Sequence, residues 1–184
     1  MDQERKQAQP ETSGQDNATR LGQRTRHAFD AWVASKLHDE STDVEGVKLK
    51  RGEVAYCAID GAALVQAGRA EAPSVTDTGL LVVTNQRCVF VGPKRTTEWA
   101  YSKLLGYSLD GEAVAMFNVS NRQKTTGVKY NVESEPQIDA TIAAAIARFH
   151  GEEEHAALVD ALEQDYRRSF AEWEEVGSHA PPTA

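Results

Sequence analysis

The sequence has 184 residues, of which 40% are hydrophobic and 26% charged, as expected for one soluble globular domain with extensions. No apolar run approaches the roughly 20 residues that cross a bilayer, and the polar N-terminus lacks the apolar core of a signal peptide, so we expect a cytoplasmic protein without a transmembrane segment. The net charge of −8, without a basic stripe interleaved with aromatic residues, argues against nucleic-acid binding.

The N-terminal region is predicted to be a tail followed by a helix. Residues 1–18 contain no aromatic or branched apolar side chain and are expected to be disordered. Residues 19–45 are expected to form a helix, from about Thr19 to Leu37, and a polar linker. The helix is predicted because apolar side chains recur on one face, at Phe29, Trp32, Val33 and Leu37.

The middle of the chain, residues 46–150, is predicted to be a domain of short strands followed by a helix. Two apolar segments, Gly79–Val83 and Cys88–Val91, flank the polar turn Thr84–Arg87, which is the pattern of an antiparallel hairpin. Asp60-Gly61 is a strong turn dipeptide and is predicted to end the first strand. Such signals predict seven or eight strands, typical of a small barrel or sandwich, at 54–59, 62–69, 79–83, 88–91, 96–100, 104–109, 113–119 and 126–131.

Two helices are predicted after the strands. The first runs from about Pro136 to His150 and has one apolar face, formed by Ile138, Ile142, Ile146 and Phe149. The second occupies residues 151–176, and its apolar stripe consists of Leu158, Leu162, Tyr166, Phe170 and Trp173. Residues 177–184 are expected to be a disordered tail. The region from 135 to 184 has 3 basic and 11 acidic side chains, so the last helix is strongly acidic.

No motif for catalysis is present in the sequence, so we expect no enzyme, no cofactor and no metal. There is no phosphate loop and no nucleophile elbow. His150 and His155 are five residues apart, which takes them off a common helix face. Cys57 and Cys88 lie among apolar residues and are expected to be buried free thiols. A disulfide between their strands is geometrically possible, but the expected compartment argues against it.

The segment Gly79–Phe90, GLLVVTNQRCVF, resembles a hairpin of GRAM-like and bacterial PH-like domains. In those domains a glycine and alternating hydrophobic residues lead into Thr-Asn-x-Arg, and a phenylalanine follows. Lys103-Leu104-Leu105 is similar to a short segment after the next strand of these domains, and Val119–Thr125 is similar to a loop of bacterial members. The resemblance covers about residues 46–150 and is to the pleckstrin-homology (PH) superfold.

This resemblance implies an α+β fold, namely a PH-like antiparallel barrel of seven or eight strands plugged by a C-terminal helix, with N- and C-terminal flanking helices. It also implies a binding module, since family members bind phosphoinositides, other lipids or protein surfaces. In eukaryotic members the headgroup site depends on basic residues between the first two strands. The turn expected there, Ile59–Ala63, contains an acid and no base, so lipid recognition is the second choice.

Basic residues in turns are the candidate ligand-binding residues, because loops on a rigid scaffold hold many binding sites. They are Arg87, Lys94, Arg95, Arg122 and Lys124. Their ligand would be an anionic lipid or a phosphate group, with the protein peripheral at the membrane. Whether the two loops that contain Lys94 and Arg122 lie at the same end of the barrel is open. The alternative is that these are solubilising turn residues and that Arg87 pairs with a carboxylate.

The last predicted helix supplies the candidate partner-binding residues, because Trp and Tyr are frequent interface anchors. They are Leu162, Tyr166, Phe170 and Trp173. The alternative is that this stripe packs on the barrel or on the N-terminal helix of the same chain. The sequence therefore predicts a non-enzymatic PH/GRAM-like binding module that acts as a protein-interaction adaptor, with a protein partner or with itself. The runner-up is an anionic-lipid or phosphate-binding module.

Overall fold

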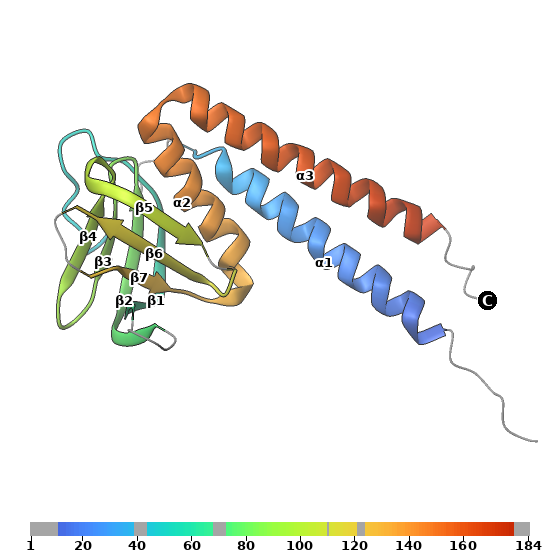
Figure 1. Cartoon of the computed structure of the whole chain (residues 1–184), viewed down its shortest axis with the longest axis horizontal. Helices are drawn as coiled ribbons and strands as arrows, with labels where there is room; N and C mark the ends of the chain where they lie inside the picture. The colour runs from blue at the N-terminus through green and yellow to red at the C-terminus, as the bar shows by residue number, and fades with distance from the viewer. Residues whose placement is uncertain (1–10, 39–43, 68–72, 110, 121–123, 179–184) are drawn as a thin grey trace, which may run out of the picture.

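The computed structural model confirms an α+β fold with one antiparallel sheet and three α-helices (Figure 1). The residues that it describes are 11–38, 44–67, 73–109, 111–120 and 124–178. Within these residues no helix is both long enough and apolar enough to span a membrane. The sheet has seven strands, at the lower end of the predicted seven or eight.

The strands pair in the order β4-β3-β2-β1-β7-β6-β5, so β1 lies at the centre and β4 and β5 form the two edges. All neighbouring pairs are antiparallel. Short 3₁₀ turns at Tyr101–Lys103 and Val132–Ser134 connect elements. The strands are β1 Ala55–Gln66, β2 Ser74–Thr84, β3 Arg87–Val91, β4 Thr96–Ala100, β5 Leu104–Leu109, β6 Val114–Val119 and β7 Thr126–Lys129.

The first strand corrects one prediction, because Asp60-Gly61 does not form a turn. Instead β1 continues through it with a register shift between Ile59 and Ala62, which marks a β-bulge against β2. Gly61 takes a positive φ of 74° there, which glycine adopts without steric cost. The predicted strand at 62–69 is therefore the second half of β1, and this half also pairs with β7.

The sheet curves so that its two halves face each other around one apolar core. Trp99 of β4 is fully buried, and its ring centroid lies 4.9 Å from that of Phe117 on β6. Its indole Nε1 also donates a hydrogen bond of 3.0 Å to Thr126 Oγ1 on β7. These contacts join strands that are far apart in the pairing order, since β4 is an edge strand and β6 and β7 belong to the other half.

Helix α2, Glu135–His150, covers this core and has two buried faces. Ile138, Ile142 and Ile146 belong to the same hydrophobic cluster as the sheet residues. The small side chains Ala140, Ala144 and Ala147 are also buried, and they let another helix approach closely. Helix α2 contacts both long helices, α1 and α3 (Figure 1), so it lies between the sheet and the helix pair.

The two long helices, α1 at Glu11–Ser35 and α3 at Glu152–Ser178, pack against each other in antiparallel orientation (Figure 1). Their far halves extend past α2 and the sheet. Helix α1 begins before the predicted Thr19, so the prediction of a disordered tail is wrong for residues 11–18, while residues 1–10 lie outside the described residues. At the other end, 177–178 belong to α3, and 179–184 lie outside the described part.

Candidate interaction surfaces

Side-chain hydrogen bonds hold the turn between β2 and β3, residues 84–87, in place, and we call this turn the latch. Thr84 Oγ1 accepts hydrogen bonds from the backbone N–H groups of Gln86, at 3.1 Å, and Arg87, at 3.0 Å. The Asn85 side chain accepts from the backbone N–H of Val54 at 2.9 Å and donates to the carbonyl of Gly52 at 3.0 Å. The Thr-Asn-x-Arg motif therefore fixes the segment that leads into β1.

Arg87 is buried in this latch and paired with carboxylates. Its guanidinium donates to both oxygens of Glu53, at 2.7 and 3.0 Å, and it also bonds to Glu98 and to the carbonyl of Lys48. The hydrogen bond to Glu53 is the main cause that raises the pKa of Arg87 above its usual value. The structure therefore agrees with the alternative that Arg87 pairs with a carboxylate. Its guanidinium donates to groups of its own chain rather than facing a ligand.

Lys94 and Arg95 lie in the turn between β3 and β4, and both contact the start of β2. Lys94 Nζ donates to the carbonyl of Thr76 at 3.2 Å, and Arg95 Nη2 donates to Thr76 Oγ1 at 3.0 Å. Asp77 accepts the backbone N–H of Lys94 at 3.1 Å, which holds the turn in place. The two cations are therefore exposed but anchored.

Lys124, in the connection between β6 and β7, lies at the same end of the sheet as Lys94 and Arg95. Gln66 at the end of β1 pairs with Ser74, the first residue of β2, and with Thr126, the first residue of β7. The backbone N–H of Ala67 also donates to the carbonyl of Thr125 at 3.2 Å. The sequence left open whether the two basic loops lie at the same end, and Lys124 of the second loop does lie at the end of Lys94 and Arg95. Its companion Arg122 lies outside the described residues.

Gln66 at the end of β1 and Ser74 at the start of β2 also lie at this end, which we call the loop end, and the β1–β2 connection joins them in sequence. It spans residues 67–73, of which 68–72 lie outside the described part of the chain. In sequence it contains one base, Arg69, and one acid, Glu71. Residues 59–63, where a turn without a base was expected, belong to β1, so they do not count against lipid recognition between the first two strands. Val75, next to this connection, is 59% exposed.

The apolar stripe of α3 packs against α1 of the same chain, which is the alternative to partner binding that the sequence allowed. The Tyr166 ring stacks on Trp32 at 5.5 Å between centroids and meets Phe29 edge-on at 5.3 Å. Phe170 and Trp173 continue this row, with ring centroids 6.0 and 5.9 Å from their neighbours. Leu162 on the same stripe is half-buried. The helix pair therefore has an aromatic seam.

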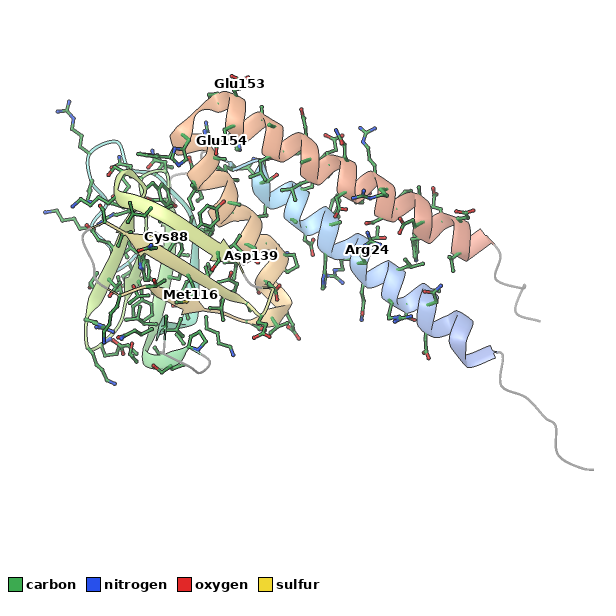
Figure 2. All side chains as sticks on the ribbon, viewed as in Figure 1. Arg24, Cys88, Met116, Asp139, Glu153 and Glu154 are labelled. Carbon is green, nitrogen blue, oxygen red and sulfur yellow. The ribbon has the colours of Figure 1, made fainter. Side chains whose placement is uncertain are left out.

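Small residues let the two helices approach closely in their far halves. A Cβ on Gly22 would lie 3.3 Å from Nε1 of Trp173, so the indole occupies the space that a side chain would fill. Thr25 is buried and its Oγ1 donates to the carbonyl of Ser169 at 3.0 Å. An exposed ion pair between Arg24, which is labelled in Figure 2, and Glu172, at 3.0 Å, links the same turns. These contacts make the helix pair a defined platform.

One side of this platform remains apolar and exposed. Phe29, Trp173 and Val33 are 42%, 40% and 37% exposed. Ala28 and Ser35, on a neighbouring face of α1, are buried, and Phe29 contacts Tyr166, so the exposed row lies at the margin of the contact between α1 and α3. We call this row the aromatic ridge, defined as Phe29, Val33, Tyr166, Phe170 and Trp173. The prediction from sequence missed Phe29 and Val33, although their spacing of four was a usable signal.

Cys57 and Cys88 are free thiols and cannot form a disulfide in this fold. Cys57 pairs with Val83 across β1 and β2, and Val83 pairs with Cys88 across β2 and β3. One full strand therefore separates them, which puts their Cα atoms roughly 9–10 Å apart, beyond the 7 Å limit. Burial raises the pKa of each thiol to about 12, and Cys88 lies within the sheet (Figure 2). Neither thiol is suited to nucleophilic chemistry.

Comparisons with known proteins give no family for this chain. No family model matches it, and no curated protein matches it. Among solved structures it is similar to the C-terminal domain of an unknown protein from Leishmania infantum, with a TM-score of 0.39 and 11% sequence identity, over 52% of this chain and 86% of that one.

In the described residues, no cluster of three or more His, Cys, Asp or Glu side chains could hold a metal ion.

Proposed function

We propose that the chain is a non-enzymatic PH/GRAM-like binding module that acts as a protein-interaction adaptor through the aromatic ridge. Support for the PH-like part comes from the strand order, with β1 shared between the two halves of a curved sheet, and from the helix that covers the core. Support for the adaptor part comes from the exposed aromatic side chains on a helix pair that extends past the domain (Figure 1). The ridge is the observation that carries the proposal.

Contiguous apolar surface in water is unfavourable and typically marks an interaction site. Aromatic residues in a pre-formed arrangement bury much area for little loss of side-chain freedom, which makes them frequent hot spots of protein interfaces. Tyr166 and Phe170 are already held by their neighbours in the seam, so a partner would meet an ordered surface.

The double variant Phe29→Gln/Trp173→Gln is expected to lose partner binding while keeping its fold. Both side chains are about 40% exposed, and glutamine suits a helix. Removal of two hot-spot aromatics should weaken the complex at least about 30-fold. The measurement is capture of partners from a lysate by the immobilised chain, followed by titration calorimetry with the purified partner.

The matched control is Leu105→Gln, which removes an apolar side chain that is 68% exposed on β5 and does not belong to the aromatic ridge. This variant should bind as the wild type does. Equal binding by the wild type and the double variant would contradict the use of the ridge, and circular dichroism of both proteins tests that the helices are intact.

A second candidate function is favoured by one observation, the meeting of basic turns at the loop end. Lys94 and Arg95 are anchored to the start of β2, and Lys124 precedes the start of β7, which lies on the other side of β1 from β2. Exposed Val75 stands between these turns in the sheet. An apolar residue among anchored cations suits an anionic lipid surface, since basic side chains near such a surface contribute about 1 kcal/mol each. Under this function the protein would be peripheral at the membrane.

Vesicles of phosphatidylcholine with phosphatidylserine test this second function. The triple variant Lys94→Gln/Arg95→Gln/Lys124→Gln should bind about 100-fold more weakly than the wild type at low salt, and added salt should weaken the wild type. The control removes three cations near the β2–β3 turn, at the opposite end of the sheet, as Lys48→Gln/Lys50→Gln/Arg51→Gln. Equal loss in both triple variants would mean that only net charge matters, and no binding at low salt would exclude the function.

A further inference from the structure

Strand β5 is an open edge of the sheet. It pairs with β6 on one side, and in the described part of the sheet no strand pairs with its other side. The four consecutive residues Leu105–Ser108 are all exposed, so this edge is accessible from outside. An edge of this kind presents a row of backbone N–H and C=O groups with which another extended chain can pair.

Edge strands of folded proteins usually carry charges or a proline that prevent such pairing, and β5 carries neither. Its sequence, LLGYSL, contains no charged residue. The opposite edge strand, β4, is different, because its Glu98 forms ion pairs with Arg87 and Lys50. The chain therefore protects one edge of its sheet with charges and leaves the other without them.

The two faces of β5 offer different surroundings to an added strand. Tyr107 lies opposite the buried Phe117 of β6, so its side chain is on the core face of the sheet, yet it is 41% exposed. Gly106 lies opposite the exposed Asn118 on the other face, and a Cβ built on it would meet no atom within 4 Å. A large apolar side chain of an added strand would cover this glycine.

Acidic side chains at the start of α3 lie beside the core face of β5. Burial, and next the charge of Glu154, raise the pKa of Tyr107, so this carboxylate is close enough to act on the ring. Glu152 and Glu153 belong to the same first turn of α3, and Figure 2 labels Glu153 and Glu154 at this end of the helix. A basic side chain of an added strand would face these carboxylates if it projected on the same side as Tyr107.

We infer that β5 is extended by a strand from a basic protein partner, namely an extended segment in which lysine or arginine alternates with large apolar residues. The basic residues face Tyr107 and Glu154, and the apolar residues cover Gly106. A second copy of this chain fits less well, because two β5 strands paired about their middle would bring both acidic starts of α3 to the same side, close to each other. The edge is separate from the aromatic ridge, so this partner is additional to the one proposed above.

Hydrogen exchange of the full chain with the peptide acetyl-Lys-Val-Lys-Tyr-Lys-Val-amide at about 1 mM tests the inference, since a complex of millimolar affinity is half formed there. The peptide should slow the exchange of β5 amides at least about twofold. A peptide with proline in place of valine and tyrosine has the same charge but cannot continue the pairing, so it should leave the exchange unchanged. So should the peptide with glutamate in place of lysine.

Reversal of one charge tests the chemistry of the partner. Glu154→Lys should weaken binding of the basic peptide about 10-fold. The matched control is Glu174→Lys, which makes the same change at an exposed position near the other end of α3 and should bind as the wild type does. The ridge variant Phe29→Gln/Trp173→Gln should also bind normally. Because the partner pairs with the backbone of β5, Leu105→Gln remains a control for the ridge.

Any one of three results would overturn the inference. They are β5 amides that exchange equally fast with and without the basic peptide, equal slowing by the proline or the glutamate peptide, and unchanged binding by Glu154→Lys. None of these results bears on the proposed function, which is judged by the loss of a partner in the ridge variant.

Discussion

Replacing Glu53 by alanine is expected to lower the free energy of unfolding by about 3–5 kcal/mol, the usual cost of leaving one member of a buried ion pair alone. The Glu53 side chain is fully buried and that of Arg87 is 9% exposed. Without Glu53, the guanidinium of Arg87 would lose both of its short bonds, and Thr84 Oγ1 would lose its acceptor at 2.8 Å. Urea denaturation measures the change.

The matched control is Lys50→Ala, which removes a cation from the same cluster at its exposed edge. Lys50 Nζ lies 3.5 Å from Glu98, and both side chains are about half exposed. Exposed pairs of this kind contribute less than about 1 kcal/mol. A Glu53→Ala variant as stable as Lys50→Ala would show that the latch does not hold the fold together.

The same pair makes stability depend on pH. Burial by itself raises the pKa of Glu53, but hydrogen bonds from Arg87, the Lys50 backbone and Thr84 outweigh it and lower the pKa below its usual 4.5. Since the folded-state pKa is the lower one, the contribution of the pair is complete above pH 4.5 and is lost as the pH falls through the folded value. Glu53→Ala should therefore lose less stability than the wild type between neutral pH and about pH 3.

The second large effect is expected at Trp99, where alanine should cost about 3–5 kcal/mol. The ring is fully buried and contacts Phe117, and its Nε1 bonds to Thr126. Because these contacts join the β4 edge to the other half of the sheet, the variant should also weaken the closure of the sheet. Hydrogen exchange at β4 amides should then rise more than at the central strand β1.

Trp99→Phe separates the two contributions of this side chain. Phenylalanine keeps the aromatic contact with Phe117 and removes the hydrogen bond to Thr126, so a smaller loss of about 1–2 kcal/mol is expected. If the alanine variant cost no more than the phenylalanine variant, the packing between the two halves would contribute little.

Short elements with a clear local pattern could be predicted from the sequence. The predicted strands at 96–100 and 104–109 have the same bounds as β4 and β5, because turns bound them on both sides. Asp60-Gly61 misled the prediction, since its turn propensity is local, whereas pairing with β2 continues β1 past this dipeptide through a β-bulge and β7 pairs with the second half of the strand. Tertiary pairing prevailed over local preference.

The candidate binding surfaces also depend on contacts between residues that are far apart in the sequence, which local patterns do not reveal. The periodicity of α3 predicted its stripe correctly, but the identity of the surface that covers it depended on α1, far away in sequence. Arg87 stood in a turn and therefore looked available, whereas its partner Glu53 is 34 positions away. Whether basic turns meet at one end is a matter of strand order, and the strand order depended on β1 being one long strand.

The pairing of α1 with α3 also has a consequence for the order of events during synthesis. Helix α1 leaves the ribosome before any strand, and its partner α3 is made after the last strand and after α2. The apolar face of α1, with Trp32 and Phe29, must therefore wait in water for nearly the whole chain to emerge. Because long loops must close before this contact can form, we expect the sheet and α2 to fold first and the helix pair to join only after α3 has been made.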